Sequence, residues 1–162
     1  MSGGATWSDW WREFLGIPTS ATNRALEILN QIYVQKSHHA ALFKQHAENM
    51  QYPQFRDKLL AIATDEAEHA ESLAGKIKLL GGRVPDVAKI TDTEKTSWQY
   101  LLEDLNTERQ SAAALIQQAQ SLREEIPSVA DLLEQIYQNS EKHCESLRQM
   151  LMRSDPQSHL AF

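Results

Sequence analysis

Four ionisable residues interrupt apolar stripes that otherwise repeat at helical spacing: Glu66, His69, Glu108 and His143. A buried carboxylate without a partner is strongly unfavourable, so these side chains must meet each other or a cation. Glu66 and His69 are three residues apart, and this spacing lets one helical face present a carboxylate and an imidazole to a metal ion. The pattern predicts a metal site made by these four residues.

Each of the four also has an interpretation that needs no metal. Glu66 and His69 can form a hydrogen-bonded pair, and His143 can be a core histidine whose polar atoms are satisfied. Glu108 can face solvent, because its helix is acidic in any case. The residues alone leave both interpretations open for Glu66 and His69, and for His143 the two are evenly balanced.

The remaining histidines and the cysteine are predicted to lie outside this site. His39 and His46 share a helical face, and together with His38 they are interpreted as surface residues or a packing seam. Cys144 is the only cysteine, which excludes an internal disulfide and a Cys-rich zinc or iron–sulfur site built from this chain alone. Any metal must therefore bind to histidine and carboxylate.

The composition of the chain argues against some classes of binding partner. A chain of 162 residues suits one domain, and its net charge of -6 without a basic cluster argues against nucleic acid. No apolar run approaches the roughly 18 residues that cross a bilayer, and the first residues lack the pattern of a signal peptide. We therefore expect a cytoplasmic protein.

Four helices must position the candidate residues. Prolines and apolar periodicity place them at about residues 20–50, 54–80, 92–123 and 128–153. Two apparent capping boxes, Thr91-x-x-Glu94 and Ser128-x-x-Asp131, mark the starts of the last two. The fold class is an all-α four-helix bundle, expected to occupy residues 20–153 and to be followed by a C-terminal tail, 154–162.

The connections favour two antiparallel hairpins joined by a crossover at about residues 81–91. If the second and third helices run parallel, the four candidate residues fall at a similar height along the bundle. A short repeat supports two related hairpins, because residues 67–73 and 141–147 share His, Glu, Ser and Leu in register.

An aromatic segment precedes the bundle, at residues 1–19. Trp7, Trp10, Trp11 and Phe14 recur at helical spacing and predict a short amphipathic helix. Packing on the bundle or across a dimer is the preferred interpretation, and docking into a protein partner is the alternative. We expect a homo-oligomer, with a dimer favoured, and no membrane partner for so acidic a chain.

Residues 62–73 and 131–143 resemble the second and fourth helices of the rubrerythrin and bacterioferritin families. The resemblance extends over about residues 22–152. It implies a ferritin-like fold and, in intact members, a two-iron site that handles oxygen, peroxide or ferrous iron. Glu66, His69 and His143 match ligand positions of these families, and Glu108 is the best match in the third helix.

The resemblance breaks at two ligand positions. When the resemblance is followed along the chain without a gap, Tyr33 and Ser140 fall at positions where these families have glutamates. Neither side chain can supply the missing negative charge. The resemblance thus implies at most one ion per chain, iron or manganese. Haem is not expected, because Ala67 stands where bacterioferritins place a methionine ligand.

Two functional interpretations follow from this incomplete set of metal ligands. The first is a metal-binding ferritin-like protein, an iron or manganese redox protein with an incomplete two-metal site. The second is a non-enzymatic helical scaffold or partner-binding module that retains a relic of the site. The sequence identifies no catalytic residue and leaves the question of an enzyme open.

Overall fold

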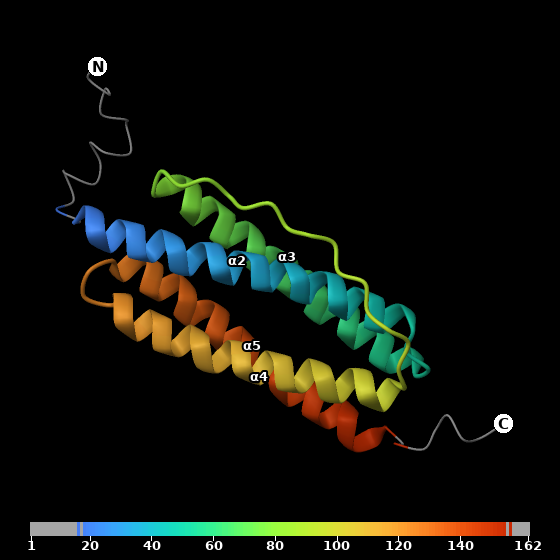
Figure 1. Ribbon diagram of the computed structural model, residues 1–162. Coiled ribbons are helices and arrows are strands. Elements are labelled where there is room, and N and C mark those ends of the chain that lie inside the picture. The colour runs from blue at the N-terminus through green and yellow to red at the C-terminus, as the bar shows by residue number, and fades with distance from the viewer. Residues whose placement is uncertain (1–15, 17, 155, 157–162) are drawn as a thin grey trace.

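The computed structural model describes residues 16, 18–154 and 156. Four helices account for most of this part of the chain: α2 (Thr19–Glu48), α3 (Pro53–Leu79), α4 (Ser97–Leu122) and α5 (Pro127–Arg153) (Figure 1). The described residues contain no strand, so the predicted all-α four-helix bundle is confirmed. The expected Trp-rich helix lies outside the described residues.

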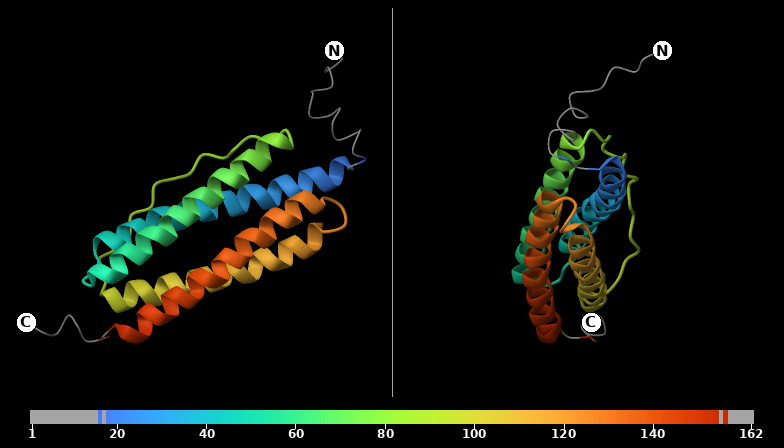
Figure 2. Two further views of the ribbon diagram at one scale, coloured as in Figure 1. Left: turned by 180° about the vertical axis from the view of Figure 1, so that it is seen from behind. Right: turned by 90° about the vertical axis from the view of Figure 1, so that its left-hand side faces the viewer.

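The helices form two antiparallel hairpins, α2 with α3 and α4 with α5. The crossover between α3 and α4 runs outside the bundle for its whole length, beside α2 and α4 (Figure 2). As a result, α3 and α4 point in the same direction, which is the condition that brings Glu66 and Glu108 to one height.

Helix α4 begins at Ser97, several residues after the predicted start. Its N-cap is Thr96, whose Oγ1 accepts a hydrogen bond from Gln99 N at 3.0 Å, while Gln99 Oε1 accepts one from Thr96 N at 2.9 Å. The predicted Thr91–Glu94 capping box is therefore wrong. Residues 92–95 belong to the crossover, where side-chain contacts with α2 and α4 replace helical hydrogen bonds.

The Ser128–Asp131 capping box is also wrong. Helix α5 begins at Pro127, and its N-cap, Ile126, makes no side-chain capping bond. Proline suits the first helical position because it has no N–H to leave unsatisfied. Asp131 instead forms an ion pair with Arg123 at the end of α4.

A polar layer divides the core of the bundle. One apolar cluster includes Leu29, Leu73, Ile77, Leu115, Leu122 and Leu133, and the other includes Phe43, Phe55, Leu59, Tyr100, Leu101 and Leu147. Four buried polar residues lie between them, one from each helix: Lys36, Glu66, Glu108 and Ser140. Each of the four is 0% exposed, so the charges of Lys36, Glu66 and Glu108 must be balanced inside the protein.

The end of α3 packs closely against α2 through Gly82. A Cβ atom at this position would lie 2.5 Å from Leu26 Cδ2 and 3.2 Å from the carbonyl oxygen of Ile77. We expect Gly82→Ala to lower the free energy of unfolding by about 1–3 kcal/mol, because the added methyl group overpacks this contact. Urea denaturation measures the change.

Gly75 provides the matched control, since a Cβ there meets nothing within 4 Å. Gly75→Ala should raise the stability by about 0.5–1 kcal/mol, because alanine in a helix interior loses less conformational entropy than glycine. A Gly82→Ala protein as stable as the original would contradict the packing described here.

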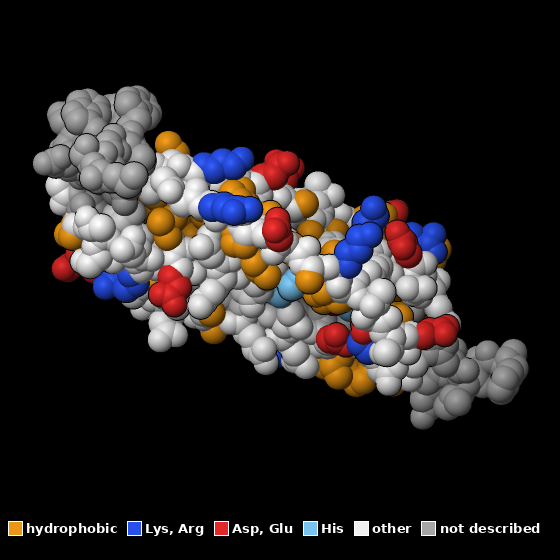
Figure 3. Space-filling model, turned by 45° about the horizontal axis from the view of Figure 1, so that its top comes forward, with side chains coloured by type: hydrophobic (Ala, Val, Ile, Leu, Met, Phe, Trp, Pro, Cys, Tyr) orange, Lys and Arg blue, Asp and Glu red, His pale blue; other side chains and the backbone are white. Residues whose placement is uncertain are grey.

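None of the helices in the described ranges is long and apolar enough to cross a membrane. On the face drawn in Figure 3, Lys and Arg side chains lie interspersed with Asp and Glu side chains. This mixed surface agrees with the absence of a basic cluster in the sequence.

Candidate metal centre

The centre of the polar layer is the ammonium group of Lys36 on α2. Its Nζ lies 3.1 Å from Glu66 Oε1 and 3.0 Å from Glu66 Oε2 on α3, and 3.4 Å from Glu108 Oε1 on α4. It also donates to Ser140 Oγ on α5 at 3.2 Å. All four helices therefore converge on one fixed positive charge.

Two imidazoles complete the inner layer. His39 Nδ1 lies 3.5 Å from both Glu66 Oε2 and Glu108 Oε2. On the other side, His143 Nδ1 lies 3.4 Å from Glu66 Oε1 and 3.5 Å from Glu108 Oε1. The second ring nitrogen of His143 contacts Asp65 Oδ2 at 3.0 Å, which fixes the orientation of the ring.

His69 lies at the margin of this cluster. Its Nδ1 contacts Glu66 Oε1 at 3.3 Å, and its Nε2 lies 3.1 Å from the side-chain nitrogen of Asn139. Of the four residues predicted from sequence, the structure thus brings Glu66, Glu108 and His143 together and leaves His69 touching the edge of Glu66.

Several side chains of α2 lie elsewhere than the sequence suggested. Lys36, and not Tyr33, is the residue that α2 contributes at the centre; Tyr33 is half-buried against an apolar cluster. His39 and His46 are 4% and 1% exposed, so of the two interpretations, surface residues or a packing seam, the first is wrong for both. The spacing of Ile32, Lys36, His39 and Phe43 places Lys36 and His39 on the apolar stripe, and this signal was available in the sequence.

Charges within the layer stabilise one another. Burial alone would raise the pKa values of Glu66 and Glu108, but contacts with the neighbouring imidazoles and with Lys36 hold both below the usual range. Burial would lower the pKa of His143, but Glu108, Glu66 and Asp65 raise it to about 10. Protonated His143 and Lys36 together therefore balance the two carboxylates.

The donor atoms of the centre fit a metal ion. Four buried atoms of this centre make no hydrogen bond within the described part of the chain: His39 Nδ1, Glu66 Oε2, Glu108 Oε2 and His143 Nδ1. Glu66 Oε2 does form an ion pair with Lys36. One ligand atom each from His39, Glu66 and Glu108 lie within 4.8 Å of one another, close enough to share one ion.

A hollow of the surface adjoins the centre between α3 and α5. Asp65, His69 and Asn139 line it together with Glu68, Ser72, Leu132, Gln135 and Ile136. The Asp65 side chain is 51% exposed while its carboxylate contacts His143. Asp65 and His69 therefore connect the buried centre to solvent.

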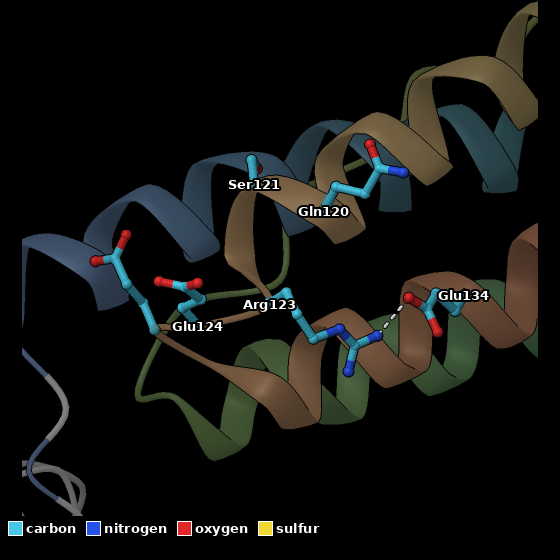
Figure 4. Close-up of a pocket in the computed structure, with 6 residues that line it drawn as sticks. Gln120, Ser121, Arg123, Glu124 and Glu134 are labelled. Carbon is cyan, nitrogen blue, oxygen red and sulfur yellow. Dashed lines mark ion pairs between the residues drawn. The ribbon is translucent and has the colours of Figure 1, made fainter.

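A second hollow, at the turn between α4 and α5, is separate from the centre (Figure 4). Its lining is polar and charged, and Arg123 pairs there with Glu134 across the turn. Glu125 in the same lining pairs with Arg24 of α2. These ion pairs join helix ends at the surface and present no converging set of ligands.

The bundle is similar to known proteins in two comparisons, one with family models and one with solved structures. The family model described as the ferritin-like domain matches residues 19–154. Among solved structures, the Desulfovibrio desulfuricans bacterioferritin, described with its diiron site in different catalytic states, aligns with a TM-score of 0.74 and 24% identity. The alignment covers 82% of this chain and 81% of that one. No curated protein sequence matches the chain.

Proposed function

The chain belongs to the ferritin-like family, and we propose that it is a metal-binding member whose centre holds one divalent ion, iron or manganese, beside a built-in ammonium group. The observation that carries the proposal is that buried ligand atoms of His39, Glu66 and Glu108 lie within 4.8 Å of one another beside Lys36. His143 is placed to serve as a further ligand.

Charge limits this centre to one ion. Two divalent ions need several carboxylates to offset their mutual repulsion, and the centre offers those of Glu66 and Glu108. Lys36 already contributes one positive charge at 0% exposure. A single divalent ion can be accommodated if His39 and His143 bind it as neutral imidazoles and release their protons. A second ion would add two buried charges without compensation.

Each residue has a distinct role in this arrangement. Glu66, Glu108 and His39 hold the ion, and Asp65 orients the His143 ring from the solvent side. Lys36 contacts both carboxylates and fixes their positions, and His69 contacts Glu66 Oε1. When bound, iron or manganese would supply redox or Lewis-acid chemistry at a site shielded from bulk water.

A second candidate function is a metal-free scaffold. Lys36 and protonated His143 already neutralise Glu66 and Glu108, so the layer can be stable as an internal ion-pair network. The two functions differ in whether the centre takes up an ion at all.

Assembly and cellular location belong to the same proposal. We infer a cytoplasmic homo-oligomer, with a dimer favoured, because the chain is ferritin-like and exposes the large apolar side chains Leu79 and Met152. Sedimentation analysis of the full chain tests the assembly, and a monomer at all concentrations would contradict it. The predicted partner surface at Trp7, Trp10, Trp11 and Phe14 remains a prediction outside the described residues.

Glu66→Gln should remove one equivalent of bound Mn²⁺ per chain. The substitution keeps the size of the side chain but removes the carboxylate that contacts Lys36, His39 and His143. Calorimetric titration of metal-free, untagged protein with Mn²⁺ measures the stoichiometry.

Glu68→Gln is the control, because Glu68 lies on the same helix and is exposed. It should bind as much Mn²⁺ as the original protein. Equal stoichiometry in the Glu66→Gln and original proteins would show that no ion binds at the centre and would favour the scaffold.

A further inference from the structure

A second group of ionisable residues lies where the crossover meets the bundle. His46 comes from α2, Asp92 and Lys95 from the crossover, and Glu103 and Asp104 from α4. The crossover is fixed at this point by a further hydrogen bond, from Gln45 Nε2 to the carbonyl oxygen of Ile90 at 2.9 Å. None of these residues belongs to the polar layer described above.

The imidazole of His46 is held rigidly. Its Nδ1 lies 2.7 Å from Asp104 Oδ1, its Nε2 lies 2.7 Å from Asp92 Oδ2, and its ring packs on Tyr100 with centroids 4.4 Å apart. His46 and Asp104 are 1% and 2% exposed. Each ring nitrogen faces a carboxylate oxygen, so without a metal both nitrogens carry a proton, and an ion bound at Nε2 would replace the proton there.

A cation already occupies the open side of this group. Lys95 Nζ lies 2.8 Å and 2.9 Å from the two carboxylate oxygens of Asp92 and also pairs with Glu103. The Lys95 side chain is 23% exposed, whereas Lys36 is fully buried. Lys95 is therefore the more accessible of the two ammonium groups, and an ion that displaces it must compensate for its contacts with Asp92 and Glu103.

We propose that His46 Nε2, Asp92 and Glu103 form a second site for a divalent transition-metal ion, at which the ion replaces the ammonium group of Lys95. Ligand atoms of these three residues lie within 4.8 Å of one another. One imidazole and two carboxylates suit zinc, iron or manganese. This ion is additional to the single ion proposed above for the polar layer at His39, Glu66 and Glu108.

Asp104 supports such a site through the ring of His46. The first oxygen of Asp104 lies 2.7 Å from His46 Nδ1, and its second oxygen makes no hydrogen bond among the described residues. An ion on Nε2 would strengthen the Nδ1–H donor that faces this carboxylate. Binding would also join α2, the crossover and α4 through one atom.

Zn²⁺ titration of the full-length, metal-free protein tests the site. Lys95→Gln should bind the additional equivalent at least about tenfold more tightly than the original protein, because the competing ammonium is gone. Glu103→Gln should weaken that equivalent by about tenfold or more, since a ligand is lost. Far-UV circular dichroism checks that both variants retain the helical fold.

Glu94→Gln is the matched control, because Glu94 is an exposed carboxylate beside Lys95 that is not a proposed ligand. It should bind like the original protein. If Lys95→Gln binds Zn²⁺ no more tightly than the original, or if Glu103→Gln binds equally well, the site does not exist. Glu66→Gln should keep this equivalent, so a failure here is distinguishable from a failure at the central site.

Discussion

Lys36→Met should lower the free energy of unfolding by about 3–5 kcal/mol in metal-free buffer, because it leaves two buried carboxylates without their fixed counter-charge. The ammonium group lies within 3.4 Å of both Glu66 and Glu108 and is 0% exposed, so water cannot replace it. Chemical denaturation of the metal-free protein measures the loss.

Adding Mn²⁺ should restore more stability to Lys36→Met than to the original protein, because the carboxylates of the variant lack a cation until the ion binds. Lys44→Met, an exposed lysine on the same helix, should have little effect in either buffer. If Lys36→Met were as stable as Lys44→Met without metal, the ammonium would not be what balances the centre.

The second large effect is expected from restoring the missing carboxylates. Lys36→Glu combined with Ser140→Glu removes the built-in cation and places four carboxylates at the centre, where each helix then contributes one. We expect the central stoichiometry to rise from about one ferrous ion to about two, and oxygen-dependent oxidation of ferrous iron to appear.

The control for this experiment is Tyr33→Glu combined with Ser140→Glu. It introduces the same residue types, but Tyr33 packs against an apolar cluster, whereas Lys36 contacts Glu66 and Glu108. This variant should not gain the second ion. Equal iron uptake by the two double variants would mean that position 36 is not where α2 meets the metal centre.

The sequence predicted the four helices because the apolar stripes are long and regular, and three of the four starts agree with the structure within a few residues. The start of α4 was missed for a tertiary reason. Asp92 bonds to His46, a residue 46 positions earlier, and this contact holds the crossover in an extended path. Local capping patterns carry no information about such a partner.

The candidate site was predictable in part. Glu66, Glu108 and His143 were recognisable because a charge in an apolar stripe is conspicuous. Lys36 was overlooked because lysine on a helix usually extends to solvent, and its burial depends on partners from three other helices. His39 was overlooked because the register carried over from the resemblance directed attention to Tyr33, about 1.7 turns away.

Anomalous diffraction from crystals grown with Mn²⁺ tests the central claim most directly, because it locates each ion and shows Lys36 in the same map. We expect one peak in the polar layer, bound by His39, Glu66 and Glu108, with the Lys36 ammonium still beside both carboxylates. Two peaks in that layer about 3.5–4 Å apart, with Lys36 displaced, would contradict it. A layer without any peak would equally contradict the proposed metal centre.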